Sequence, residues 1–406
     1  MSQTRFHGSF DSPMSWRLLC GMISTLVAVP FCLTLASVLG LTALAAMADE
    51  GFKPIGTAQS FKDAPQVSES RFEGVRGPSP FDRIALHHVT MEPWEGPMRA
   101  AKPNPPIVVL YLPGTNMNGA TAPDDIKHSL ALFLASKAID FWALDYRTHY
   151  IPSTTPQSEL KVLKNWNYEL FEDDIDAAVK YVRLKTHAKK IFLAGFSRGV
   201  ENEYLYTAMH PNIVKGLIVL DGFLNMSIPG LPPLERYVDD ISGAHLTFDK
   251  RKDLMDMVIA DPNGPAPIEK YKTAKENLEH VVYDAGGIFG GHGGLADPLA
   301  AKSDAVELAK VLITYDRYWP AVQDYENPFT PTLLTALKKS NTPVIAFCST
   351  NISAQWPKLV ADSAQSTGGK DVCVTTLTGC GHLDVLCGTS CESVVFRPIL
   401  DWLRQH

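Results

Sequence analysis

The chain has 406 residues, of which 45% are hydrophobic and 20% are charged, and its net charge is -7 at pH 7. A chain of this length can bury a large core and exceeds a usual single domain, so we expect an insertion or a second lobe. The charge is mildly negative, and no basic stripe or lysine run interleaved with aromatic residues is present. A nucleic-acid partner is therefore not expected.

Residues 1–48 have the composition of a targeting segment. No formally charged residue occurs from position 18 to position 48, two arginines precede this run, and it ends in Ala-Met-Ala at 46–48, a pattern suited to signal peptidase. The apolar run is also long enough to span a bilayer. We expect either a cleaved signal peptide or membrane attachment through residues 18–46. Both alternatives predict export to a periplasmic or extracellular location.

Patterns typical of strands and helices alternate through most of the remaining chain. Within Asp49–Pro106, one alternating segment at 83–90 predicts an antiparallel strand. Short apolar runs predict buried parallel strands at 107–112, 139–145, 191–194, 214–221, 343–348 and 371–377. Amphipathic spacing predicts helices at 124–137, 172–187, 354–365 and 393–404. Strands that alternate with helices predict an α/β fold with a mostly parallel, doubly wound sheet.

The segment Gly195-Phe-Ser197-Arg-Gly199 lies where one predicted strand passes into a helix. A serine hydroxyl is a poor nucleophile, so an enzyme that uses it must hold it exposed beside a base and near amide donors. A sharp strand-to-helix turn achieves this, and it needs glycines because side chains at the flanking positions would collide. We predict that Ser197 is a nucleophile. The alternative is a polar residue in an ordinary turn.

Residues 222–330 interrupt the alternation of strands and helices. This stretch contains clusters of Pro and Gly, two predicted helices at 250–260 and 269–280, and the glycine-dense segment 285–295 with His292. An insertion after the carboxyl end of a strand would lie over the ligand crevice of an open sheet. We predict a lid, with a packed helical subdomain that never contacts substrate as the alternative.

Five cysteines follow the leader, at positions 348, 373, 380, 387 and 391. In an oxidising compartment some of them should pair, so we expect a disulfide in the loop that contains the last three. These three also surround His382, so a structural zinc site is an alternative, although the loop lacks a close Cys-x-x-Cys pair.

The chain resembles the α/β-hydrolase superfamily in three places: the Gly195-x-Ser197-x-Gly199 turn, the loop Pro113-Gly-Thr-Asn116 after an earlier strand, and Gly381-His382 after the last strand. The resemblance implies a hydrolase core formed by residues 49–221 and 331–406, with 222–330 as an inserted cap. It also implies the chain order serine, acid, histidine.

His382 follows the last predicted strand and would project from the same sheet edge as Ser197, so we predict that it is the base. The family's acid usually follows the next-to-last strand, but no carboxylate occurs there before Asp362. Asp221 ends the strand after the nucleophile helix and is the predicted acid, unless it only forms a turn with Gly222. Asp384 is close to His382 in sequence and Asp362 should face out from a helix, so neither is preferred.

The resemblance implies an oxyanion hole made of backbone amides. One amide would come from Arg198, directly after the nucleophile, and another from the loop Gly114–Met117, with Thr115 and Asn116 as the named candidates. The side-chain amide of Asn116 could add a further donor, although an Asn in a turn usually bonds its own backbone.

These observations predict an exported serine hydrolase that cleaves a carboxylic ester through an acyl-serine intermediate. No metal or organic cofactor is expected, and the substrate would be a small-molecule or lipid-like ester. Amide or peptide hydrolysis by the same residues is the alternative within enzymes. A non-catalytic binding protein that keeps the fold is the alternative from another class. The sequence does not predict an oligomeric state.

Overall fold

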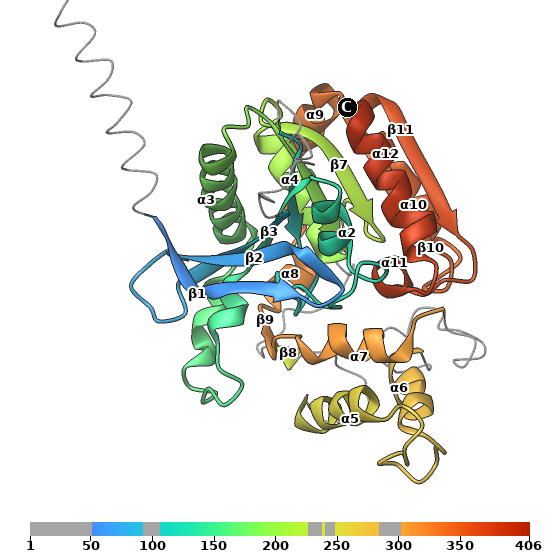
Figure 1. Cartoon of the computed structure of the whole chain (residues 1–406). Helices are drawn as coiled ribbons and strands as arrows, with labels where there is room; N and C mark the ends of the chain where they lie inside the picture. Colours follow the sequence, from blue (N-terminus) through green and yellow to red (C-terminus); the bar gives the residue numbers. More distant parts are fainter. Residues whose placement is uncertain (1–50, 92–105, 226–237, 240–247, 284–301) are drawn as a thin grey trace, which may run out of the picture. The chain divides into compact units, whose positions relative to one another are not determined.

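A computed structural model describes residues 51–91, 106–225, 238–239, 248–283 and 302–406 (Figure 1). All of them belong to one structural unit, Ala48–His406. The predicted leader, the glycine-dense segment 285–295 and His292 lie outside the described residues. Among the residues described, no helix has both the length and the hydropathy that a membrane span requires.

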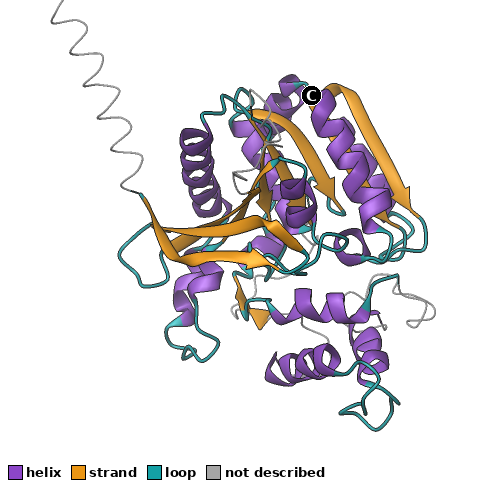
Figure 2. Ribbon diagram, viewed as in Figure 1, coloured by secondary structure: helices purple, strands orange, loops and turns teal. Residues whose placement is uncertain are grey.

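The centre of this unit is a nine-stranded sheet with the order β1-β2-β3-β5-β4-β6-β7-β10-β11 (Figure 2). The strands are β1 Phe52–Phe61, β2 Ala64–Val75, β3 Arg83–Met91, β4 Val108–Leu112, β5 Asp140–Asp145, β6 Ile191–Phe196, β7 Val214–Leu220, β10 Thr342–Ser349 and β11 Gly368–Leu377. In this spatial order, each of the strands β1, β2 and β3 is antiparallel to the next. Each of the strands β5, β4, β6, β7 and β10 is parallel to the next. The predicted mostly parallel sheet is confirmed.

The amino-terminal edge of the sheet contains two strands that the sequence analysis missed. Only β3 was expected before residue 107, but β1 and β2 form a hairpin that extends the sheet beyond it. Within β1, only the first and last residues, Phe52 and Phe61, are buried. Backbone pairing holds this strand, so its sequence lacks the apolar alternation that identifies a half-buried strand.

Helices cover both faces of the sheet, as a doubly wound fold requires. One apolar cluster joins the sheet to α3 Tyr168–Thr186, α4 Arg198–Met209, α9 Pro331–Ser340 and α10 Trp356–Gln365. The other cluster includes α2 Leu130–Ser136 and α12 Arg397–Gln405, which follows a π-helical turn at Glu392–Phe396. Short 3-10 helices lie at Arg147–Tyr150 and Leu160–Asn165.

The predicted helix at 124–137 is much shorter than expected. The sequence predicted 124–137, whereas α2 begins at Leu130, because the side chain of Ser129 caps it by accepting a hydrogen bond from the Leu132 amide. The preceding residues form turns in which the Asp125 carboxylate binds the backbone amide of Lys127.

The inserted region is largely helical where it is described. Its elements are β8 Val238–Asp239, α5 Phe248–Ala260, α6 Ala274–Tyr283, α7 Ala305–Ile313, β9 Tyr318–Trp319 and α8 Val322–Tyr325. Helices α5, α6 and α7 pack on one another (Figure 1). Their buried residues Leu254, Leu278 and Leu308 belong to the same apolar cluster as α2 and α12. The role of this region as a lid stays a prediction.

Candidate active site

Ser197 lies in a sharp turn between β6 and α4, with φ 52° and ψ -119°, a conformation that non-glycine residues rarely adopt. A Cβ atom on Gly199 would lie 1.9 Å from the Leu112 carbonyl oxygen, and one on Gly195 would lie 2.5 Å from the Gly199 oxygen. Both positions therefore require glycine. The turn keeps Ser197 half-buried, at the carboxyl end of a central strand.

His382 and Asp221 meet at the same sheet edge. The Nδ1 atom of His382 lies 2.7 Å from Asp221 Oδ2, and the two side chains are 3% and 0% exposed. The imidazole also lies 4.6 Å from the ring of Phe196, measured between centroids. Because Phe196 immediately precedes Ser197, the structure brings the histidine, the aspartate and the serine turn together. With Nδ1 facing the carboxylate, Nε2 is the ring nitrogen that could exchange a proton with a hydroxyl.

Three further hydrogen bonds orient the Asp221 carboxylate. Ser349 donates twice, from its backbone amide at 2.6 Å and from its hydroxyl at 2.7 Å, and Trp356 donates its indole N–H at 2.9 Å. Sequence reasoning missed both residues. Ser349 ends β10, the next-to-last strand, where the family's acid usually stands, so its position was the available signal.

The loop after β4 approaches the nucleophile turn. A Cβ atom on Gly114 would lie 3.0 Å from Ser197 Cβ, and the Met117 amide closes a turn onto the Gly114 carbonyl at 3.0 Å. Thr115 is half-buried in this turn. The side-chain amide of Asn116 does not bond its own backbone, as an Asn in a turn usually would, because it donates to the Asp316 carbonyl at 3.0 Å. It therefore ties the loop to the inserted region.

Arg198 has two separate roles in the geometry. Its backbone amide is at the first position of α4, where helix N–H groups lack an intrahelical acceptor. Its side chain is buried and points to four acceptors: Glu201 Oε2 at 2.8 Å, the Tyr168 hydroxyl at 2.8 Å, the Gln323 carbonyl at 2.9 Å and Asp324 Oδ1 at 3.0 Å. The last two belong to α8, so the guanidinium fixes this helix to the nucleophile turn.

The two other candidate acids are engaged elsewhere. Asp362 is exposed and forms an ion pair with Lys358 on the same helix, as expected. Asp384 is buried in α11, Asp384–Cys387, where it accepts hydrogen bonds from the Gly381 amide at 2.6 Å and from the Ser303 hydroxyl. Asp384 therefore holds the backbone of the loop that carries His382.

The predicted disulfide is not formed. In the described part of the chain, all five cysteines are free thiols. Burial raises the pKa of Cys387 well above its usual value and that of Cys380 to about 11. Across the residues with assigned positions, three or more metal-ligand atoms converge only at Asp125, His128 and Glu307. The geometry thus gives no support to zinc at His382.

The sequence matches no protein-family model, and no curated protein is detectably similar to it. Among solved structures, a proposed lipase from Sulfolobus solfataricus is 25% identical, with a TM-score of 0.69, and the match covers 88% of this chain and 99% of that one. We therefore assign the chain to the α/β-hydrolase superfamily.

Two weaker matches to solved structures are also found. A carboxylesterase of the thaumarchaeon Nitrososphaera gargenis is 12% identical, with a TM-score of 0.44, over 86% of this α/β-hydrolase and 99% of the other chain. A thermophilic esterase from Thermogutta terrifontis is 14% identical, with a TM-score of 0.44, over 82% and 98%. Both likenesses are too distant to carry a conclusion about activity.

Proposed function

We propose that this α/β-hydrolase cleaves carboxylic esters, with Ser197 as nucleophile, His382 as base and Asp221 as the acid that orients the imidazole. The single observation that supports this most strongly is the 2.7 Å contact between His382 and Asp221 beside the strained serine turn. A carboxylate at Nδ1 stabilises the tautomer in which Nε2 can accept a proton. The lipase description of the protein from Sulfolobus solfataricus agrees with ester hydrolysis.

The proposed reaction has two halves. The Ser197 oxygen attacks the ester carbonyl carbon while its proton moves to His382 Nε2, and the carbonyl oxygen becomes an oxyanion facing backbone amides of Arg198 and the Thr115–Asn116 turn. The carbon–oxygen bond to the alcohol then breaks, and the alcohol leaves with the proton held by His382. Water, deprotonated by the same imidazole, attacks the acyl-serine and releases the carboxylic acid, returning the proton to Ser197.

The proposal extends to the location and to the inserted region. Residues 1–48 would direct export or anchor the chain, and residues 222–330 would act as a lid over the site. Amino-terminal sequencing of the mature protein from a membrane and a soluble fraction distinguishes a cleaved signal from a retained anchor. Export is contradicted if the chain remains inside the cell with residue 1 intact.

Active-site labelling tests the chemistry directly. We expect a fluorophosphonate probe to label the protein and mass spectrometry to place the adduct on Ser197, with labelling and p-nitrophenyl acetate turnover both abolished in Ser197→Ala. Ser393→Ala is the control, because its exposed hydroxyl only bonds a local carbonyl. Labelling that persists in Ser197→Ala would exclude this serine. Turnover of aminoacyl anilides in preference to esters would favour the amide alternative.

A further inference from the structure

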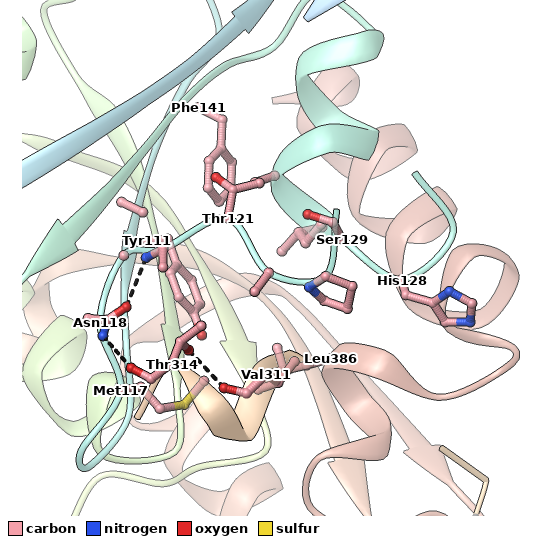
Figure 3. Close-up of a pocket in the computed structure, with 17 residues that line it drawn as sticks. Tyr111, Met117, Asn118, Thr121, His128, Ser129, Phe141, Val311, Thr314 and Leu386 are labelled. Carbon is pink, nitrogen blue, oxygen red and sulfur yellow. Dashed lines mark hydrogen bonds between the residues drawn. The ribbon is translucent and has the colours of Figure 1, made fainter. Parts of the chain in front are cut away.

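The structure contains a pocket of about 60 Å³ (Figure 3). A cavity needs roughly 15 Å³ to hold one water molecule, so this pocket has room for about four. Its walls come from five parts of the fold: the sheet, the loop after β4, α2, the inserted region and α11. The residues that line it include Tyr111, Met117, Thr121, Val311 and Leu386.

Two wall segments continue directly from the proposed catalytic groups. Met117 closes the turn that begins at Gly114, and the ideal Cβ position of Gly114 is 3.0 Å from Ser197 Cβ. Leu386 lies in α11, four residues after His382. The pocket is thus bordered by the segment that would bind the carbonyl oxygen and by the one that carries the base.

The pocket is mostly apolar but contains a hydroxyl group that the protein leaves unsatisfied. Thr121 lines the pocket, and its Oγ1 atom is buried and has no hydrogen-bond partner. A buried polar group without a partner is costly, so a ligand that supplies an acceptor atom would gain affinity there.

We propose that this pocket binds the acyl chain of the ester and selects short acyl groups, of up to about four carbons, that carry a hydroxyl or keto oxygen. The proposal rests on the proposed function. The acyl side is assigned because the loop that would contact the acyl carbonyl runs straight into the pocket wall. The proposal narrows the substrate class from small or lipid-like esters to esters of short acyl groups that carry a hydroxyl or keto oxygen.

The size of the pocket is tested with p-nitrophenyl esters from acetate to octanoate and the full chain. We expect kcat/KM of the parent enzyme to fall at least tenfold from butyrate to octanoate. Leu386→Ala enlarges the pocket and should shift the optimum to hexanoate or longer. Leu359→Ala is the matched control, because Leu359 is 38% exposed and lies outside the pocket. It should keep the parent profile.

The polar end is tested by comparing p-nitrophenyl 3-hydroxybutyrate with p-nitrophenyl butyrate. We expect the parent enzyme to prefer the hydroxylated ester about tenfold, and Thr121→Val to reduce that preference to within twofold. Thr148→Val is the control. It also removes a buried hydroxyl that has no hydrogen-bond partner, but from a threonine that does not line the pocket.

The outcomes separate the two proposals. If the enzyme is labelled at Ser197 and turns over esters, but Leu386→Ala and Thr121→Val both keep the parent preferences, the pocket assignment is wrong and the proposed function stands. If no ester is hydrolysed and Ser197 is not labelled, the proposed function fails and the pocket assignment fails with it. If the substitutions change the preference of the enzyme only among esters that differ in their alcohol, the pocket binds the leaving group and the acyl proposal is wrong.

Discussion

Asp221 is the residue whose role depends most on its surroundings. It has φ 51° at the end of β7, and its carboxylate accepts hydrogen bonds from Ser349, Trp356 and His382. An ordinary turn aspartate would bond neighbouring backbone amides, whereas these partners lie 128 to 161 positions away in the chain. The arrangement explains why a strained backbone persists there: surrounding contacts fix the side chain in one orientation.

The first prediction concerns the substitution Asp221→Asn. We expect kcat to fall by about 10³ to 10⁴, because the amide would favour the wrong imidazole tautomer. Steady-state hydrolysis of p-nitrophenyl acetate measures the loss. Asp362→Asn is the control, since Asp362 is exposed and pairs only with Lys358, and its activity should stay within twofold. A loss below tenfold in Asp221→Asn would remove Asp221 from the catalytic set.

A second prediction concerns Ser349→Ala. The substitution removes one of the two hydrogen bonds that Ser349 gives to Asp221 and leaves the other, from its backbone amide. Hydrogen bonds to charged groups contribute about 1.5–3 kcal/mol, so we expect the free energy of unfolding to decrease by that amount. We also expect kcat to fall by about tenfold with KM unchanged. Urea denaturation and kinetics measure the two effects. An unchanged kcat would show that Ser349 acts on stability alone.

At the level of elements, the inserted segment 302–325 contacts three loops of the proposed site. Ser303 binds Asp384 in the loop that carries His382, and Asp316 binds Asn116 and Asn118 in the loop after β4. Gln323 and Asp324 bind the Arg198 guanidinium at the nucleophile turn. This segment therefore links the three loops to one another. A role in positioning these loops fits its contacts whether or not the rest of the insertion moves as a lid.

We predict that Arg198→Met lowers the free energy of unfolding by about 3–5 kcal/mol, because the buried Glu201 carboxylate would lose its cationic partner and keep the hydrogen bond from the Tyr168 hydroxyl. The double variant Arg198→Met/Glu201→Gln should recover part of the loss. Arg397→Met is the control, since its ion pair with Glu392 is exposed and should contribute less than about 1 kcal/mol. Equal losses in the two single variants, measured by urea denaturation, would contradict the prediction.

In the molecule as a whole, a buried cluster of three ionisable side chains joins the antiparallel and parallel parts of the sheet. His87 of β3 bonds Glu69 of β2 and, at 2.9 Å, Asp145 of β5. Burial alone would lower the pKa of His87, but Asp145 and Glu69 outweigh burial and raise it from 6.5 to about 9. Asp145 also accepts a hydrogen bond from the Gly119 amide at 2.7 Å, so the group reaches the loop after β4.

The pKa shift predicts how stability depends on pH. Because the folded-state pKa of His87 is raised, its contribution is fully present below pH 6.5 and is lost as pH rises through about 9. We expect the parent protein to lose a few kcal/mol more than His87→Gln between pH 6.5 and pH 9.5, as measured by urea denaturation at each pH. His88→Gln, at the neighbouring position, is the control. Parallel pH profiles for the parent and His87→Gln would refute the assignment.

The sequence by itself determined the architecture and the identity of the central strands. Buried parallel strands need continuous apolar runs, and the serine turn needs glycines where a Cβ atom would collide with Leu112, so both features leave a local signature. The serine and histidine candidates were found for the same reason, since each follows directly from a recognisable strand.

Only the tertiary structure decided which distant groups meet. Strands β1 and β2 are held by backbone pairing and have no periodic apolar pattern. The partners of Asp221 and the contact of Asn116 with the inserted region depend on chain segments far apart in sequence. Local propensity constrains neighbours within a few residues, whereas hydrogen bonds between strand ends depend on how the whole sheet is ordered. The sequence therefore supplied the candidates, and the fold determined which of them contact one another.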